Sequence, residues 1–279
     1  MKNLNNKVAA ITGAGSGIGR MLAVRLAAEH CHLALSDIDE AGLLETKAMV
    51  GGKVKVSTHL VDVANQDEVK RFAEEAAMYH GGIDMIINNA GVSLGAFLET
   101  VALEDFKWLM NINFWGVVYG TMAFLPYLRK RPQGHVVNIS SINGIIPNPN
   151  NGPYCAAKFA VKGYTETLYQ ELKDTSIRVS CVHPGGIKTN IARNARVTQT
   201  FFDLPKDKAA EIYDKEVFIT TAEDAARIII TGIKKNRRRI MVGRDAKFLD
   251  LMTRLFPKTM VYLSAVVSKR MAKKYAGAN

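Results

Sequence analysis

Short apolar runs of strand length alternate with longer amphipathic segments through most of the chain. Three of the strand candidates end at or close to glycine or proline, as VAAIT does before Gly13 and IRVSCV does two residues before Pro184. Between them apolar residues recur at helical spacing, as at Ile18, Leu22 and Leu26. We expect strands at residues 8–12, 32–36, 54–61, 85–87, 135–139, 177–182 and 239–242, and helices at 18–29, 40–50, 68–79, 104–128, 154–173 and 222–234.

This alternation indicates a parallel sheet, because two neighbouring parallel strands need a crossover connection and a helix usually supplies it. Right-handed crossovers then place helices on both faces. The sequence therefore predicts an α/β fold, a Rossmann-type doubly wound parallel sheet of about seven strands. No linker or repeat divides the chain, so we expect one domain over residues 1–243 and a basic helical extension over residues 244–279.

Composition excludes several classes of protein. The chain has 279 residues, of which 48% are hydrophobic, and this excludes disorder for the bulk of it. Three cysteines without a CxxC pair cannot form a disulfide framework, so we expect a reduced, cytoplasmic setting. We see no secretory signal and no apolar run long enough to span a bilayer. The six histidines form no metal motif, and we expect no metal.

Charge is distributed unevenly along the chain. The net charge is +11, but residues 225–279 hold 14 Lys or Arg and two acids, whereas residues 1–224 have a net charge of −1. A basic protein can be a nucleic-acid binder, and a salt-dependent shift assay would reveal one. Because the excess belongs to one C-terminal segment, we expect no nucleic-acid partner.

Glycines gather directly after the first predicted strand, in TGAGSGIG at residues 12–19. Glycine allows a tight turn and a close approach to a pyrophosphate, and the following helix presents free N–H groups. The spacing is GxxxGxG rather than the common GxGxxG. The alternative is a flexible turn, but four glycines in seven residues favour a nucleotide site made of Gly13, Ser16, Gly17, Ile18 and Gly19.

Asp37 ends the second predicted strand, about 20 residues beyond this loop. A carboxylate at this position can accept hydrogen bonds from the adenosine ribose hydroxyls, and it repels a 2′-phosphate. Its neighbours Ser16 and Ile38 are neutral and offer a phosphate no cation. These residues predict NAD rather than NADP, although an aspartate here can also simply form a turn or cap a helix.

Tyr154 and Lys158 are spaced to share one face of a helix. A nearby lysine favours the phenolate, which lowers the pKa of the phenol so that it can move a proton. Such a pair alone is weak evidence for a catalytic site, but this pair follows the fifth strand of the same sheet. That strand ends close to Ser141, in the crevice where such sheets bind ligands, and Ser141 can donate to a substrate oxygen.

These motifs together resemble the short-chain dehydrogenase/reductase family, in its single-domain, nicotinamide-dependent branch. The resemblance covers about residues 5–243. Its matches, in order, are TGAGSGIG at 12–19, SDID at 36–39, DV at 62–63, NNAG at 88–91, NFWG at 113–116, ISS at 139–141, YCAAK at 154–158 and HPGGIKT at 183–189.

The resemblance implies a role for each matching residue. Tyr154 would be the acid/base, Lys158 would hold the nicotinamide ribose, Ser141 would be the catalytic serine, and Asn113 would anchor a water in a proton relay. Asn111 is more plausibly helix surface. Adenine, ribose and nicotinamide contacts would come from Asp62, Val63, Asn89, Ala90, Gly91, Ile187 and Thr189. The family usually forms homodimers or homotetramers through helices that correspond to residues 104–128 and 154–173.

The resemblance predicts an NAD(H)-dependent oxidoreductase that interconverts an alcohol with a ketone or aldehyde. Two alternatives stay open: an NADP-dependent carbonyl or 3-oxoacyl reductase of the same family, and a nucleotide-sensing scaffold without turnover. The intact set of Asn113, Ser141, Tyr154 and Lys158 argues against the scaffold.

Substrate specificity should reside in the loop after the sixth strand, residues 190–220, whose length suggests a mobile lid. It contains Phe201 and Phe202, and the apolar Ile142, Ile145 and Ile146 lie in the loop before Tyr154. These side chains favour a hydrophobic small-molecule substrate, or else they only pack the lid on the body. We expect Arg193 and Arg196 of the lid to be solvated.

The basic extension has two apolar stretches at helical spacing, separated by Pro257. Phe248, Leu251 and Leu255 belong to the first stretch, and both stretches are flanked by lysine and arginine. Two interpretations remain: the helices pack on the body or a partner subunit, or residues 244–279 make peripheral contact with an anionic membrane.

Overall fold

The computed structural model describes residues 1–200 and 204–276. Its centre is a seven-stranded parallel sheet in the order β11-β7-β6-β4-β1-β2-β3. This confirms the predicted fold. The strands are β1 (Val8–Thr12), β2 (His32–Asp37), β3 (Val56–Leu60), β4 (Met85–Asn88), β6 (Gly134–Ile139), β7 (Ile177–Pro184) and β11 (Arg239–Val242).

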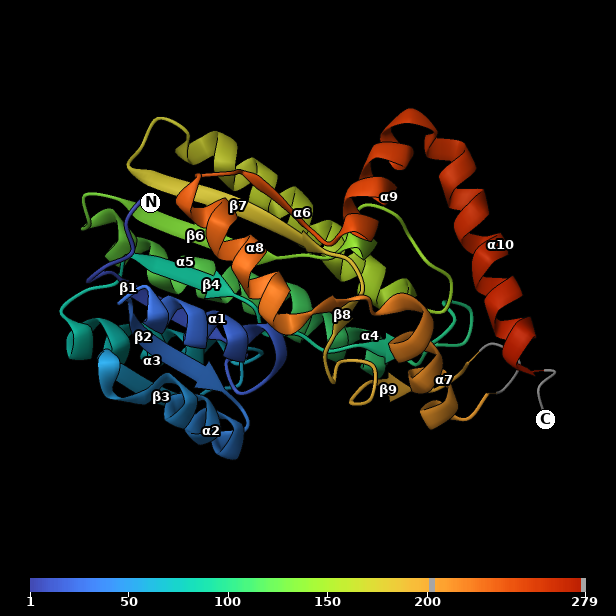
Figure 1. Cartoon of the computed structure of the whole chain (residues 1–279), viewed down its shortest axis with the longest axis horizontal. Helices are drawn as coiled ribbons and strands as arrows, with labels where there is room; N and C mark the ends of the chain where they lie inside the picture. The colour runs from blue at the N-terminus through green and yellow to red at the C-terminus, as the bar shows by residue number, and fades with distance from the viewer. Residues whose placement is uncertain (201–203, 277–279) are drawn as a thin grey trace.

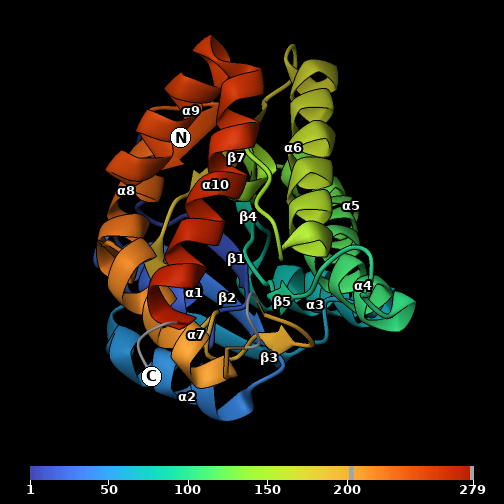
Figure 2. The same cartoon turned by 90° about the vertical axis from the view of Figure 1, so that its right-hand side faces the viewer.

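Helices cover both faces of the sheet, as Figures 1 and 2 show. On one face lie α1 (Gly17–Ala28), α2 (Glu40–Val50) and α8 (Ala222–Lys234), which form an apolar core with β1, β2 and β11. On the other lie α3 (Gln66–His80), α5 (Gly116–Arg129) and α6 (Gly152–Leu172), with their own core. The central strands are buried on both sides, which explains why they appear in the sequence as continuous apolar runs.

The chain reverses direction across the sheet between β1 and β4. From β1 it runs outward to β2 and β3, and then crosses over to β4 on the opposite side of β1. In open α/β sheets, ligands bind beyond the carboxyl ends of the strands at such a switch point. The loops that follow β1 and β4 are therefore where a ligand crevice is expected.

The helix expected over residues 104–128 is interrupted. It consists of α4 (Leu103–Met110), a π-helical turn at Asn111–Trp115 and then α5. A π turn adds a residue to the helical repeat and is frequent at functional sites. Here it contains Asn113, which is fully buried, whereas Asn111 is exposed, as expected.

Smaller elements connect the lid to the body. The strands β5 (Leu94–Gly95) and β9 (Arg196–Val197) pair with each other, as do β8 (Ile187–Lys188) and β10 (Thr220–Thr221). The lid also holds α7 (Lys206–Ile212), followed by a π turn at Tyr213–Val217. Short 3-10 turns occur at Gly51–Lys53 and Ile142–Gly144.

The C-terminal extension is helical, as predicted. It forms a hairpin of α9 (Arg244–Leu255) and α10 (Pro257–Ala276), with Pro257 at the first helical position, where its missing N–H costs nothing. Figure 1 shows the hairpin turn standing clear of the body, with α10 running back toward α7. Among the described residues, no helix combines the length and the apolar character needed to cross a membrane.

Candidate active site

The glycine loop after β1 is a tight turn in which side chains at several of the glycines would be strained or would clash. Gly13 and Gly17 have φ angles of +65° and +51°, in the left-handed region that disfavours side chains. A Cβ on Gly19 would lie 2.0 Å from the carbonyl oxygen of Gly13. Ser16 precedes α1, and its side chain makes no capping hydrogen bond. The first N–H groups of α1 are therefore available to an anion such as a pyrophosphate.

The ends of β1 and β4 are held together by Thr12, a residue that we did not single out from the sequence. Its hydroxyl oxygen accepts hydrogen bonds from the backbone N–H of Asn89 (3.0 Å) and Ala90 (3.1 Å). The Asn89 amide in turn donates to the carbonyl oxygens of Thr12 (2.9 Å) and Gly13 (3.0 Å). The only sequence signal for this contact was a polar residue at the end of an apolar strand.

Asp37 lies against the glycine loop. Its Oδ2 accepts from the N–H of Gly15 at 2.8 Å, and its Oδ1 accepts from the N–H of Asp39 at 3.1 Å. The capping role that competed with the cofactor interpretation belongs to Asp39, which accepts from the N–H of Gly42 at the start of α2. Asp37 therefore presents a negative charge beside the turn.

One cation also touches the glycine loop. The Arg20 guanidinium donates to the Gly15 carbonyl oxygen and to the Thr46 hydroxyl, and pairs with Glu45 at 2.8 Å. Arg20 was not recognised from the sequence, because its position on α1 gives no hint that the side chain folds back. Its charge is compensated by Glu45.

Lys158 is buried, with only 3% of its surface exposed. Its Nζ donates to the Ile139 carbonyl oxygen at 3.1 Å and lies 5.6 Å from the centroid of the Tyr154 ring. Burial disfavours the charged form and lowers the pKa of the Lys158 ammonium to about 8. The spacing of the two residues on α6 thus brings them together as predicted.

Tyr154 and Ser141 face each other across the end of β6. A hydrogen bond from the Ser141 hydroxyl lowers the pKa of Tyr154, but burial acts more strongly and raises it to about 12. We expected the lysine to lower the phenol pKa; in the protein without ligand, burial dominates instead. The Ser141 hydroxyl oxygen also accepts from the N–H of Asn143 at 3.1 Å. The adjacent Ser140 has a different task, since its hydroxyl donates to the Lys158 carbonyl oxygen.

Asn113, Gly91 and Lys158 converge at one point. The Asn113 side chain makes two hydrogen bonds to the backbone of Val92, at 2.8 and 2.9 Å, which anchor it to the loop after β4. A Cβ on Gly91 would lie 3.2 Å from Asn113 Oδ1 and 3.5 Å from Lys158 Nζ. Three segments distant in sequence therefore meet where a water or a ribose could bridge amide and ammonium.

His183, at the end of β7, makes a hydrogen bond to the backbone of Ser141. Its Nδ1–H donates to the Ser141 carbonyl oxygen at 3.1 Å, and burial lowers the pKa of His183 to about 4, so the imidazole is neutral. From the sequence we considered histidines only as metal ligands, and so we did not predict the contact between His183 and Ser141. A buried polar residue inside an apolar strand was the available signal.

The remaining predicted cofactor residues lie at two places. Ile187 is buried in β8, and Thr189 lies beside the glycine loop, since a Cβ on Gly17 would be 3.2 Å from its methyl group. Val63 is buried against the start of α5, and Asp62 accepts from the N–H of Ala64 at the surface.

The lid and the loop before Tyr154 differ in part from expectation. Arg196 is not simply solvated, because its guanidinium lies 3.7 Å from the centroid of the Trp108 ring and 3.2 Å from Asp105. Ile142 and Ile146 are buried in a cluster with Ala246 of α9. This supports the alternative that they pack protein against protein. Phe201 and Phe202 lie outside the described residues.

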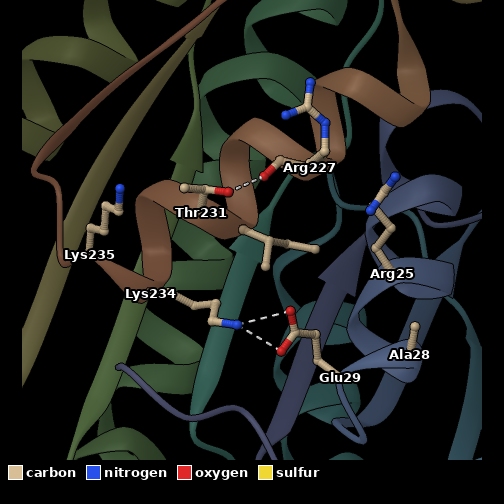
Figure 3. Close-up of a pocket in the computed structure, with 8 residues that line it drawn as sticks. Arg25, Ala28, Glu29, Arg227, Thr231, Lys234 and Lys235 are labelled. Atoms are coloured by element: carbon tan, nitrogen blue, oxygen red, sulfur yellow. Dashed lines mark hydrogen bonds and ion pairs between the residues drawn. The ribbon is translucent and has the colours of Figure 1, made fainter.

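A pocket of about 360 Å³ between α1 and α8 contains none of the predicted site residues (Figure 3). Lys234 pairs with Glu29 at 2.8 Å, and the two arginines in its lining pair with Glu223 and Asp224. Its charges are therefore largely compensated, and we assign it no catalytic role. Within the described part of the chain, no three His, Cys, Asp or Glu side chains are grouped to hold a metal ion.

Known proteins resemble most of this chain. The family model for short chain dehydrogenases matches residues 7–200. A Mycobacterium tuberculosis protein named as an oxidoreductase, SadH, is 41% identical over 265 residues, which cover 91% of this chain and 92% of that protein. An 11-beta-hydroxysteroid dehydrogenase of Pinus massoniana is 33% identical and covers 86% of this chain and 67% of its own.

A solved structure agrees with the fold as well. The short chain dehydrogenase/reductase of Burkholderia phymatum, in complex with NAD, superposes with a TM-score of 0.83 at 29% identity, over 93% of this chain and 96% of its own. The match of the family model over more than half of the sequence, together with these relatives, establishes that this chain belongs to the short-chain dehydrogenase/reductase family.

Proposed function

We propose that this protein is an NAD(H)-dependent oxidoreductase that interconverts an alcohol with a ketone or aldehyde. One observation carries the proposal: Tyr154 and Lys158 of α6 gather with Ser141 and Asn113, from two other segments, beyond the carboxyl ends of the strands. A scaffold that only sensed a nucleotide would need the glycine loop but would have no use for this cluster.

The residues of the crevice fit a dinucleotide. The turn at Gly13 and Gly17 leaves N–H groups of α1 free for a pyrophosphate, and Asp37 is held where it can accept from ribose hydroxyls. Ile187 and Thr189 would contact the nicotinamide half, while Asp62, Val63 and the segment 89–91 would contact the adenosine half. When bound, the cofactor supplies or accepts the hydride.

The protein's own residues then handle the proton. The Tyr154 hydroxyl gives its proton to the carbonyl oxygen during reduction and takes it back from the alcohol during oxidation. Ser141 donates a hydrogen bond to the same oxygen and holds it at the phenol. A positively charged Lys158 near the phenol would favour the phenolate and so act against the effect of burial. Asn113 would hold a water through which protons reach Lys158.

Asp37 supports NAD over NADP, because its carboxylate would repel a 2′-phosphate. Arg20 is the cation that lies against the glycine loop, and its partner Glu45 compensates it. We expect the specificity constant for NAD to exceed that for NADP, and Asp37→Ser to narrow the ratio. Equal use of NADP by the unmodified protein would contradict the assignment and point to Arg20 as the phosphate ligand.

We propose a hydrophobic small molecule as the substrate. Support comes from a relative whose name specifies a hydroxysteroid. We also propose a homodimer or homotetramer, because large apolar side chains are exposed on the π turn, α5 and α6, among them Trp115, Met122 and Phe159.

The decisive experiment mixes the full chain with NAD and a panel of aliphatic, aromatic and steroid alcohols, and with NADH and the matching ketones. Turnover is followed by the absorbance of reduced nicotinamide, and cofactor binding by calorimetry. Turnover that depends on Tyr154 supports the proposal. Binding of NAD without turnover on any substrate would favour the nucleotide-sensing scaffold. If neither NAD nor NADH bound, both the oxidoreductase and the scaffold would be refuted.

A further inference from the structure

The α9–α10 hairpin leaves its large apolar side chains uncovered. On α9, Phe248, Leu251 and Leu255 share one helix face and are 61%, 53% and 57% exposed. At the turn, Phe256 is 54% exposed. Of the twelve residues of α9 only Ala246 is buried. These side chains therefore do not serve to pack α9 on the body.

The outer face of α10 mixes apolar and basic residues. Tyr262, Leu263 and Val267 are exposed there. Between and around them lie the exposed cations Lys258, Lys269, Arg270 and Lys273. The opposite side of α10 contacts the protein, through the partly buried Met260 in the cluster around Ala246 and through the Ser264 hydroxyl, which donates to the Pro147 carbonyl oxygen at 3.1 Å.

Negative charge is absent from this outer surface within the described residues. Residues 244–276 contain eight basic residues and two acidic ones, Asp245 and Asp250. Asp245 accepts from the N–H of Gly186 at 2.7 Å, and Asp250 pairs with Arg239 and with Arg254. Both acids are thus engaged in contacts within the protein. What faces outward is apolar and cationic.

We propose that the hairpin docks on an anionic lipid membrane, with α10 in the plane of the interface and the exposed apolar side chains of both helices inserted among the headgroups. A lipid surface matches both features, since lysine and arginine attract anionic headgroups while aromatic and aliphatic side chains enter the acyl boundary. A symmetric contact with a second copy would place one basic face against the same basic face. A nucleic acid would match the charge but not the apolar side chains.

The hairpin is attached to the loop after β6, through Ser264 and Pro147, and to the segment after β7. Asp245 at the start of α9 holds the Gly186 loop, and Lys274 and Tyr275 at the end of α10 bind Glu216 of the lid. Figure 2 shows α10 between the α8–α9 side and α6. An apolar pocket of about 430 Å³ lies between α10 and α6. Docking through the outer face would therefore hold the mouth of the crevice close to the lipid.

The test is co-sedimentation of the full chain with vesicles of phosphatidylcholine alone or mixed equally with phosphatidylglycerol. We expect binding to the mixed vesicles at low salt. An apolar variant with Leu251→Ser, Leu255→Ser and Phe256→Ser should bind at least about tenfold more weakly. A charge variant with Lys258→Glu, Lys269→Glu and Lys273→Glu should lose on the order of a hundredfold, at about fivefold per cation.

Matched controls lie elsewhere on the surface. Leu44 on α2, Leu60 on β3 and Met78 on α3 are at least as exposed and lie toward the edge of the sheet opposite β11, and their change to Ser should leave binding unchanged. Lys47, Lys53 and Lys70 are exposed on α2, on the 3-10 turn after it and on α3, toward the β3 edge of the sheet, which is the edge opposite β11. Reversing their charges alters the net charge as much as the α10 variant does, but should weaken binding far less.

Four results would overturn the proposal. They are no sedimentation with the anionic vesicles, full binding by the apolar variant, equal losses in both charge variants, and a smaller oligomer in the apolar variant by light scattering. The last would show that a second copy covers the hairpin. Thermal unfolding checks that each variant folds; if the apolar variant does not, the comparison of the two charge variants decides. None of these measurements depends on enzymatic activity.

Discussion

Helices α8 and α9 are both amphipathic and are separated by one short strand, but they use their apolar faces differently. In α8 the apolar stripe of Ala225, Ala226, Ile229, Ile230 and Ile233 is buried against α1 and the sheet. In α9 the corresponding stripe is largely exposed. Apolar residues at helical spacing therefore predict a helix equally well in both cases, but do not tell what covers its face.

The comparison separates two parts of the molecule. The body buries the apolar face of α8 in its core and holds Lys158, its proposed functional cation, in the interior. The hairpin exposes both apolar and cationic groups, and these become useful only against something outside the chain. We therefore expect substitutions in the body to change catalysis or stability. Substitutions of the exposed hairpin side chains should change membrane binding alone.

The largest expected effect is on turnover. Tyr154→Phe keeps the aromatic ring and removes the proton that the body contributes, so the turnover number should fall by about 10²–10⁴-fold, while NAD affinity and vesicle binding stay unchanged. Tyr164→Phe, on the same helix, is the control and should retain turnover. Near-normal activity of Tyr154→Phe on a good substrate would remove the tyrosine from the mechanism.

The second largest effect is expected on stability, which should distinguish α8 from α9. Ile229→Ala opens a cavity in the core between α8 and the sheet, and should lower the free energy of unfolding by about 2–5 kcal/mol. Urea unfolding measures it directly. A loss of less than about 1 kcal/mol would mean that the α8 face is not the tightly packed surface described above.

The buried ammonium of Lys158 should make the free energy of unfolding depend on pH. The pKa of Lys158 is about 8 in the folded protein and 10.5 in the unfolded chain, so the unfolded state binds more protons between these values. The free energy of unfolding should therefore rise from pH 8 to pH 10, by about 2 kcal/mol more in the unmodified protein than in Lys158→Met. Equal slopes in urea titrations would show that the ammonium is solvated.

The smallest effect is expected in the hairpin. Leu251→Ala removes a side chain that is 53% exposed, so the free energy of unfolding should change by no more than about 0.5 kcal/mol. Comparing this loss of unfolding free energy with that of Ile229→Ala tests directly whether the α9 face is exposed while the α8 face is buried. A loss comparable to that of Ile229→Ala would show that the α9 face is covered in solution by another copy of the chain.

Much of the fold and part of the site could be predicted without the structure. Strand and helix periodicity predicted all seven strands of the sheet, because burial of a strand or a helix face leaves a local pattern. The spacing of Tyr154 and Lys158 likewise predicted their proximity, since four residues make about one helical turn. The π turn at Asn113 was missed, because the apolar pattern on both sides of it still fits a continuous helix.

Other features depend on residues far apart in the chain. Thr12 binding the loop after β4, His183 binding the Ser141 carbonyl and Arg20 folding onto Gly15 leave no local signature. The direction of the Tyr154 pKa shift also escaped prediction, because it depends on how much protein surrounds the phenol and not on the lysine alone.

The sequence by itself determined the order of strands and helices, the glycine turn, the carboxylate after β2 and the basic character of the C-terminus, because each is written in neighbouring residues or in a short repeat. Only the tertiary structure decided that β1 and β4 meet at a switch point, that Gly91, Asn113 and Lys158 share one point, and that α9 exposes the kind of face that α8 buries. The physical reason is that burial and desolvation are set by which distant segments pack together, and local periodicity carries no information about that choice.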